Sequence, residues 1–489
     1  MQTTHDIKKY LQQDSTVYYF ISATNFNLMM MGDWLKNWFN INLIDCYNQQ
    51  NNTLLTPEYQ ETPLFKDIES INHFLLGNKK MIDHIEQQKK NNVEIKILFL
   101  FYDKALEELV KSLDLKLIMP SNQLVKEIDN KITTTEIGND VKVPSVPNAL
   151  VPITSYKDLT DIIKKAQLGK KVVIQTAYGD SGKTTFFIEN EDDFNQVKDK
   201  ISAEKKVKIM RNINCLQVAI EACATKKGTY IGPILTEIIG HPDLTPYQGG
   251  WCGNDVNPDA FTKETQETIY KYTELLGNAL YKRGYRGYFE VDYLIDSEQQ
   301  NAVYLGEINP RVTGISALTN LSSFCNEHIP LFAFHLLEYS EIDFALNPVQ
   351  FNQQVRNAHH KPFGQLIFKS TEPELSILTE IPATGIYQID QNQQLKWLHY
   401  ADNTIGMKKD QLFILRIMAV DKYIYKGADL VIVFSHHLMQ DQQQKNLTET
   451  AKNLIKGIKS AIKTRELTEE EQQLTERYAG QASIKTNNL

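Results

Sequence analysis

Over the first 120 residues, short apolar runs rich in β-branched and aromatic residues alternate with stretches of helical period. Strands that alternate with helices usually pair in parallel, so this pattern predicts a small α/β sheet of Rossmann-like type. No glycine fingerprint accompanies it, and the region carries no recognisable chemistry. The predicted strands are Val17–Ile21, Asn42–Cys46, Val93–Tyr102 and Lys116–Met119, and the clearest helix is Lys104–Leu113.

From residue 121 to residue 347 the β-prone runs become longer. A helical pattern over Ser121–Thr135 leads into an extended linker, Val143–Pro147, because each proline biases its predecessor away from helix. The runs that follow predict a largely antiparallel arrangement, with one long helix behind it. The predicted strands are Lys171–Ala177, Lys206–Arg211, Cys215–Ala224 and Thr229–Ile239, and the helix is Asp259–Arg283.

From about Gln350 the chain is β-rich, and a helical pattern over Asp441–Ile462 follows. These changes predict three domains, covering residues 1–120, 121–347 and 348–489. The middle domain would divide near residue 213 into a small subdomain and a larger part that carries the chemistry. The fold class is therefore α/β with α+β character. The predicted C-terminal strands are Gly364–Phe368, Gly385–Tyr387, Leu395–Leu398, Leu412–Val420 and Asp429–Phe434.

Acidic groups concentrate in two β-prone segments between residues 287 and 313, which a short polar turn separates. The segments predict a hairpin, and side chains alternate faces along each strand. One face of the first strand carries Glu290 and Asp292, and one face of the second carries Glu307, Asn309 and Arg311. If the two faces coincide, a cation is needed among the carboxylates. Hard oxygen ligands suit Mg²⁺, and the arginine fork suits a carboxylate or phosphoryl group.

A glycine-rich turn follows the strand that ends at Ala177. It also satisfies a loose phosphate-loop pattern, in which the lysine and threonine would open a helix. The residues after it are strongly β-prone, which favours a hairpin turn that folds over nucleotide phosphates. The residues expected to contact nucleotide in this turn are Gly179, Ser181, Gly182, Lys183 and Thr184.

The sequence Glu307-x-Asn309-x-Arg311, after a strand that carries Asp292, resembles the magnesium-site signature of the ATP-grasp ligases. The resemblance covers residues 121–347 well, and the flanks resemble the preliminary and C-terminal domains of biotin-carboxylase-like members. It implies an ATP-grasp fold with a Rossmann-like N-terminal domain and a β-rich C-terminal domain. Asp292, Glu307 and Asn309 would hold two Mg²⁺ ions, with Mn²⁺ as the alternative ion.

The same resemblance implies where the nucleotide would bind. The junction at Met210, Arg211 and Ile213 would offer adenine an apolar slot with backbone donors and acceptors. Many members of the family place a lysine on the strand before the glycine-rich turn, whereas this chain has Gln175 there. Either Gln175 makes a neutral contact, or Lys183 or Lys208 supplies the charge.

Composition narrows the class of protein. With 489 residues, 42% hydrophobic and 23% charged, the chain has the make-up of a multidomain globular protein. A net charge of -8 argues against nucleic acid as the main partner. The five cysteines predict neither a disulfide framework nor a zinc site.

The start lacks a signal peptide's apolar core, and no apolar run reaches the roughly 20 residues that cross a bilayer. We expect a cytoplasmic protein without membrane partners, and a homodimer is compatible with the sequence.

The resemblance implies an ATP-dependent carboxylate-amine ligase. ATP would convert a small carboxylate substrate into an acyl phosphate, and an amine substrate such as an amino acid would displace the phosphate. The products would be an amide or peptide bond, ADP and phosphate, with Arg311 and Glu307 as the catalytic residues. Two alternatives stay open: a biotin-carboxylase-like enzyme that uses bicarbonate, and a nucleotide-binding regulatory protein without catalysis, which Gln175 suggests.

Overall fold

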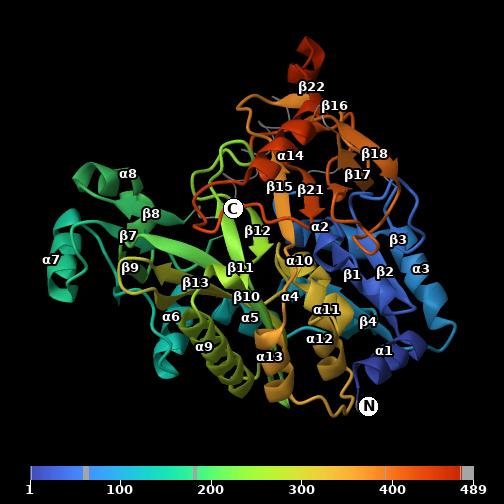
Figure 1. The fold of residues 1–489 in the computed structure, drawn as a ribbon, viewed down its shortest axis with the longest axis horizontal. Helices are drawn as coiled ribbons and strands as arrows, with labels where there is room; N and C mark the ends of the chain where they lie inside the picture. Colours follow the sequence, from blue (N-terminus) through green and yellow to red (C-terminus); the bar gives the residue numbers. More distant parts are fainter. Residues whose placement is uncertain (2, 59–64, 180–183, 391–392, 474, 476–489) are drawn as a thin grey trace.

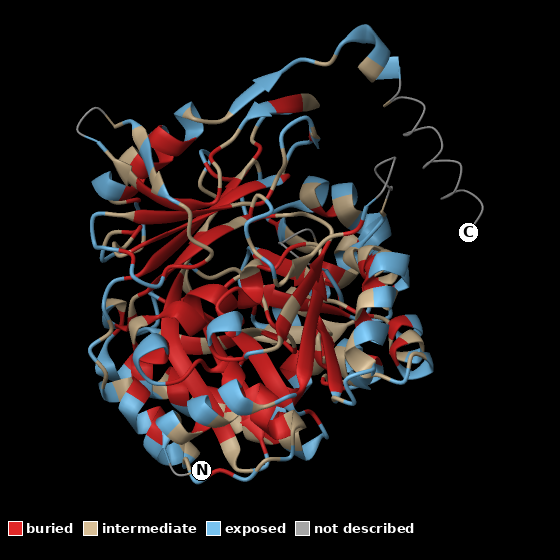
Figure 2. Ribbon diagram, turned by 90° about the vertical axis from the view of Figure 1, so that its right-hand side faces the viewer, coloured by how far each residue is buried: buried red, intermediate tan, exposed pale blue. Residues whose placement is uncertain are grey.

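The computed structural model describes residues 1–489 except residues 2, 59–64, 180–183, 391–392, 474 and 476–489. The described residues form four sheets, with the five-stranded N-terminal sheet and the small four-stranded sheet on either side of a large ten-stranded sheet (Figure 1). The strands make up most of the buried interior, and the helices carry much of the exposed surface (Figure 2). No helix in the described part of the chain is long and apolar enough to cross a membrane.

The N-terminal sheet has five parallel strands in the order β3-β2-β1-β4-β5, as the alternating pattern predicts. Its second strand is Trp38–Asn42 and not Asn42–Cys46, because the run from Trp38 supplies the residues that pair with β1. The elements are α1 Thr4–Gln13, β1 Val17–Ser22, η1 Phe26–Leu28, η2 Met31–Asp33, β2 Trp38–Asn42, β3 Leu54–Leu55, α2 Ile68–Gly77, α3 Lys79–Lys89, β4 Ile95–Phe99, α4 Lys104–Ser112 and β5 Lys116–Leu117.

Two short helices connect this sheet to the small one, where the sequence pattern predicts a single helix. The break comes at Asn130, whose side chain accepts hydrogen bonds from the Ile132 and Thr133 amides and starts a new helix. The small sheet is antiparallel, in the order β6-β9-β7-β8, and contains the predicted hairpin. The elements are α5 Asn122–Ile128, α6 Lys131–Asp140, β6 Asn148–Val151, α7 Tyr156–Ala166, β7 Val172–Gln175, β8 Thr185–Ile188, α8 Glu191–Ser202 and β9 Val207–Arg211.

The large sheet has ten antiparallel strands in the order β14-β13-β10-β11-β12-β15-β21-β19-β17-β18. Helices α9 and α13 pack against β11, and α12 packs against β13. The elements up to residue 357 are β10 Cys215–Thr225, β11 Gly228–Ile239, β12 Trp251–Val256, η3 Pro258–Ala260, α9 Lys263–Lys282, β13 Gly287–Asp296, β14 Ala302–Asn309, α10 Ser316–Leu321, α11 Ser323–Glu327, α12 Phe332–Tyr339 and α13 Pro348–Asn357.

The C-terminal strands continue the large sheet, because β15 pairs with β12. A further sheet of three short strands and helix α14 lie beyond it. The predicted domain boundaries stay a prediction, and the ten-stranded sheet contains strands from both sides of residue 347. The elements are β15 Gly364–Lys369, β16 Ser376–Glu380, β17 Gly385–Ile389, β18 Leu395–His399, β19 Leu412–Arg416, β20 Tyr423–Ile424, β21 Asp429–Ser435, α14 Glu449–Ser460 and β22 Lys463–Arg465.

The loop after β14 is fixed from two sides. Asn27, from the N-terminal domain, donates a hydrogen bond of 2.6 Å to the Thr313 carbonyl. Gln365, on β15, donates one of 2.9 Å to the Gly314 carbonyl. The Trp251 ring lies so close to Gly314 that a Cβ at this position would collide with it. This loop directly follows Arg311, so the fold holds the predicted catalytic arginine between three parts of the chain.

Candidate active site

The predicted hairpin is present as β13 and β14, and it brings the predicted metal ligands together. Asp292 pairs directly with Glu307, and Glu290 pairs with Asn309. The Asn309 side-chain amide donates a hydrogen bond of 3.1 Å to Asp292. The period of two along each strand therefore places these groups on one face, as the sequence predicts.

Two further carboxylates join this face from the neighbouring strands. Glu221, on β10, pairs with Glu290, and Glu237 lies on β11. Burial raises the pKa of Glu237 well above its ordinary value, and the charges of Asp292 and Glu307 raise it further. We call Glu221, Glu237, Glu290, Asp292 and Glu307 the acidic row. Burial, and then the charges of neighbouring carboxylates, also raise the pKa values of Glu290 and Asp292. The row is therefore an electrostatically costly arrangement that a cation would relieve.

Lys131 supplies part of the compensating charge. It opens helix α6 and is buried, and its ammonium forms an ion pair with the Glu307 carboxylate. Burial alone would raise the pKa of Glu307, but the charge and hydrogen bond of Lys131 outweigh burial and lower it. Glu307 is therefore the member of the row that is held ionised.

The groups around Asp292 fit a hard divalent cation. Asp292 Oδ1 is buried and has no hydrogen-bond partner among the described residues, although a buried carboxylate oxygen needs one. Carboxylate and amide oxygens are the ligands that Mg²⁺ prefers. Within the described residues, no three His, Cys, Asp and Glu side chains are grouped to hold a metal ion. The predicted set has only two such residues, and the amide of Asn309 would be its third ligand.

Arg311 lies at the end of this face, just beyond β14. Its Nη1 donates a hydrogen bond of 2.6 Å to Asp129, and its guanidinium lies 4.8 Å from the centre of the Phe101 ring. An ion pair at one edge and a ring against one face fix the plane of the guanidinium.

Gln175 and Lys208 face each other across β7 and β9. The Gln175 amide donates a hydrogen bond of 3.2 Å to Thr185. Lys208 is 1% exposed, and burial lowers its pKa to about 8, with a further lowering by the Lys131 charge. Lys208 is thus buried close to the Lys131–Glu307 pair.

The predicted adenine residues divide between two environments. Met210 packs with Val146 and Val173 in a small apolar cluster, which Ile213 also contacts. Arg211 is turned away, and its guanidinium donates a hydrogen bond of 3.1 Å to the Gln167 carbonyl. Met210 and Ile213 therefore lie in apolar surroundings and Arg211 does not, and adenine binding at this junction stays a prediction.

The glycine-rich turn is described only at its two ends. Gly179 has a φ of 148°, and a Cβ there would collide with the side chain of Thr184. The Thr176 amide donates a hydrogen bond of 3.3 Å to the Thr184 carbonyl, which closes the turn between β7 and β8. The strand after the turn excludes the helix that a phosphate loop requires. The predicted contacts at Ser181, Gly182 and Lys183 lie outside the described residues.

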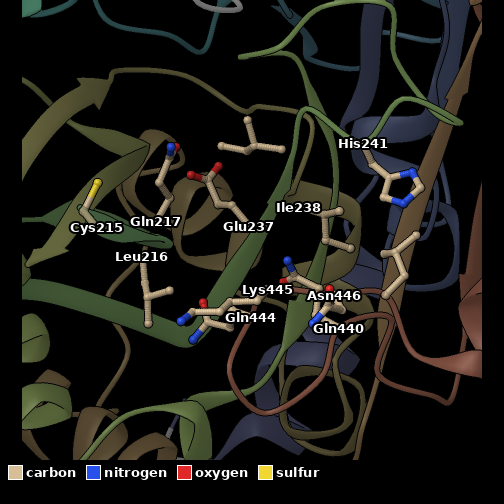
Figure 3. Close-up of a pocket in the computed structure, with 12 residues that line it drawn as sticks. Cys215, Leu216, Gln217, Glu237, Ile238, His241, Gln440, Gln444, Lys445 and Asn446 are labelled. Atoms are coloured by element: carbon tan, nitrogen blue, oxygen red, sulfur yellow. The ribbon is translucent and has the colours of Figure 1, made fainter. Parts of the chain in front are cut away.

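A polar pocket of about 170 Å³ opens beside the acidic row, between the strands β10 and β11 and the segment before α14. Gln217 and Glu237 lie side by side in it, and Cys215 and His241 are at its two ends (Figure 3). Gln440 Oε1 and Gln444 Nε2 are buried there, and no described residue forms a hydrogen bond with either atom. The pocket therefore offers an acceptor and a donor to a polar ligand.

Glu221, a member of the acidic row, also belongs to a buried hydrogen-bond network. Tyr288 and Ser316 each donate a hydrogen bond of 2.5 Å to its carboxyl group. Burial raises its pKa to about 7, and the hydrogen bonds from Ser316 and neighbouring hydroxyl groups oppose this shift. Glu221 therefore exchanges its proton near neutral pH.

We expect Glu221→Gln to remove a pH dependence of stability. The folded protein keeps this proton up to about pH 7, whereas the unfolded chain releases it near the ordinary value of 4.5. A raised pKa gives stability that is lost as the pH rises, here by about 3 kcal/mol over this range. The hydroxyls of Tyr288 and Ser316 can donate or accept, so they accommodate an amide.

Urea unfolding of both proteins across this range measures the effect. The difference in unfolding free energy between wild type and variant should change by about 3 kcal/mol over this pH range. Wild type should lose stability as the pH rises. If the unfolding free energies of wild type and variant change equally with pH, the prediction is wrong.

Sequence reasoning missed three residues of this site: Lys131, Glu221 and Glu237. Each comes from an element separate from the hairpin, and the Lys131–Glu307 pair joins residues 176 positions apart. The two glutamates offered a signal, because each is the only charged residue in a mostly apolar strand. Lys131 was visible only as part of a weak Asp-Asn-Lys pattern.

No protein-family profile matches this sequence, and no curated protein matches it. Solved structures match its fold. The ADP complex of an N5-carboxyaminoimidazole ribonucleotide synthetase is 14% identical, with a TM-score of 0.54 over 91% of this chain and 96% of that chain.

Two further structures match over similar lengths. One is the biotin carboxylase domain dimer of the 2-oxoglutarate carboxylase of Hydrogenobacter thermophilus, with MgADP, ADP and bicarbonate; it is 10% identical, with a TM-score of 0.59 over 92% of this chain and 90% of that chain. The other is an Aspergillus clavatus N5-carboxyaminoimidazole synthase with ADP and 5-aminoimidazole ribonucleotide; it is 10% identical, with a TM-score of 0.55 over 90% of this chain and 99% of that chain. At such identities the likeness establishes the fold.

Proposed function

We propose that this chain, which has the predicted ATP-grasp fold, is an ATP-dependent carboxylate-amine ligase. The observation that carries the proposal is the meeting of Asp292, Glu307 and Asn309 on one face of the hairpin, with Arg311 fixed at its end. The structures that it resembles bind ADP, and one contains MgADP. This supports ATP and Mg²⁺ as the cofactors of this chain.

The proposed reaction has two steps. A carboxylate oxygen of the first substrate attacks the γ-phosphorus of ATP, the bond to the bridging oxygen breaks, and ADP leaves. An amine then attacks the acyl carbon, phosphate leaves with the electron pair of the broken C–O bond, and the amine proton passes to a base or to solvent. The products are an amide or peptide bond, ADP and phosphate.

The residues of the site suit these steps. Mg²⁺ bound by Asp292, Glu307 and Asn309 would neutralise charge on the transferring phosphoryl group. Arg311 presents the donors that its contacts with Asp129 and Phe101 leave free, and these would hold the anionic carboxylate and the acyl phosphate. The apolar cluster at Met210 and Ile213 would receive adenine.

ADP release with a panel of substrates tests the proposal. We expect release that depends on Mg²⁺ and on one carboxylate and one amine together, with one amide formed per ADP, as mass spectrometry can measure. The panel should begin with the amino acids and small peptides. ATP binding without turnover on any member would instead support a regulatory protein.

One observation favours a second candidate function. The Hydrogenobacter thermophilus domain contains bicarbonate. If this chain also uses bicarbonate as its carboxylate, ADP release would require bicarbonate and an acceptor, and ¹³C-bicarbonate would label the product. That neighbour is also a dimer, which supports the predicted homodimer as a proposal.

A further inference from the structure

Lys208 is a buried cation that has no partner among the described residues. It is 1% exposed and lies on β9, between Leu150 on β6 and Gln175 on β7. None of the described residues gives its ammonium a hydrogen bond or an ion pair. An ammonium that is removed from water without a counter-ion destabilises the folded protein.

The other buried lysines in the described chain are paired. Lys96 contacts Glu94 at 3.1 Å and donates a hydrogen bond of 2.9 Å to Ser340. Lys131 forms its ion pair with Glu307. Both are paired without a ligand, whereas Lys208 has no partner in the part of the chain that the structure describes, and a bound anion would supply one.

The surroundings of Lys208 indicate an anion with several oxygens. The charges of Lys131 and Glu307 both act on Lys208, and Glu307 is already engaged by Lys131. Gln175, directly opposite, is neutral, and its amide is engaged by Thr185. An anion that contacts both lysines would neutralise the remaining charge.

We infer that Lys208 binds the phosphate chain of the nucleotide in this protein, together with Lys131, and that Gln175 does not. This inference rests on the proposed function, because it assumes that the ligand of the site is a nucleoside polyphosphate. The positive charge that binds phosphate would then lie on β9, whereas Gln175 lies on the neighbouring strand β7.

Calorimetry with Lys208→Met tests the inference. Methionine fits the volume of the lysine stem without its charge, and we expect the affinities for ADP and for the non-hydrolysable β,γ-imido analogue of ATP to fall by about tenfold or more. The affinity for adenosine, which has no phosphate, should stay within about twofold of wild type. Lys208→Arg, which keeps a charge, should recover part of the affinity for ADP.

Lys206→Met is the matched control, because Lys206 lies just before β9 with about half of its side chain exposed, 54%, and pairs with Glu136 at 3.6 Å. It should leave all these affinities unchanged. Thermal unfolding without nucleotide gives an independent measurement: Lys208→Met should unfold at a higher temperature than wild type, since it removes an unpaired buried charge, and ADP should stabilise it less.

The outcomes separate the inference from the function on which it rests. ADP affinity that Lys208→Met leaves unchanged overturns the role of Lys208, while ADP binding by wild type still supports the proposed function. If the variant binds ADP normally but needs more of the carboxylate substrate, Lys208 contacts that substrate instead and the inference is wrong. Failure of wild type to bind any adenine nucleotide overturns the proposed function, and the inference with it.

Discussion

Replacing Glu307 with glutamine is expected to reduce ADP release by at least about a thousandfold, because the metal site loses its ionised carboxylate. Glu307 is the member of the acidic row whose pKa is lowered. Glutamine keeps the volume and an oxygen that still accepts a hydrogen bond from Lys131, so the fold should be retained. Steady-state ADP release with the substrates found in the panel measures the effect, and circular dichroism verifies folding.

Glu298→Gln is the matched control for this change. Glu298 is exposed in the turn of the same hairpin, and its substitution removes the same charge from the same element. Its turnover should equal that of wild type. If Glu307→Gln keeps more than about a tenth of wild-type turnover, the hairpin does not hold the catalytic metal.

Arg311→Lys is expected to lower turnover by about a hundredfold while ADP affinity stays within about twofold. Lysine keeps the charge but loses the fork that Asp129 and Phe101 hold in one plane. The loss should therefore fall on the acyl phosphate, where charge develops, and not on the bound nucleotide. Single-turnover kinetics and calorimetry with ADP separate the two effects.

Arg283→Lys provides the comparison, because Arg283 also contacts an aspartate, Asp140, at 2.6 Å, but on the surface. Its turnover should be unchanged. An Arg311→Lys protein that loses ADP affinity and turnover equally would show that Arg311 binds the nucleotide in the ground state.

The central hairpin could be predicted because its signals are local. The period of two fixes which side chains share a face, so Asp292, Glu307 and Asn309 come together once the register is set. The adenine site at Met210 follows from the family resemblance alone and stays a prediction. The Lys131–Glu307 pair could not be predicted in this way, since it depends on how helix α6 packs against β14.

The C-terminal strands show the same limit at the level of the fold. Their existence follows from short β-prone runs, but their partners do not. The pairing of β15 with β12 crosses more than a hundred residues of sequence, as Gly253 lies opposite Leu366. Pairing at such separations is decided by packing and not by local pattern. The helix break at Asn130, in contrast, had a local signal, because asparagine is a preferred N-cap.

Two backbone hydrogen bonds join the hairpin to the segments where the chain enters and leaves the small sheet. The Leu305 amide, on β14, donates a hydrogen bond of 2.7 Å to the Pro144 carbonyl, where the chain enters that sheet. The Ser297 amide, after β13, donates one of 3.2 Å to the Asn214 carbonyl, where the chain leaves it. Among the described residues, the small sheet shares no ladder with the ten-stranded sheet. If the small sheet rotated about these two contacts, the distance between Lys208 and Glu307 would change while the hairpin kept its position.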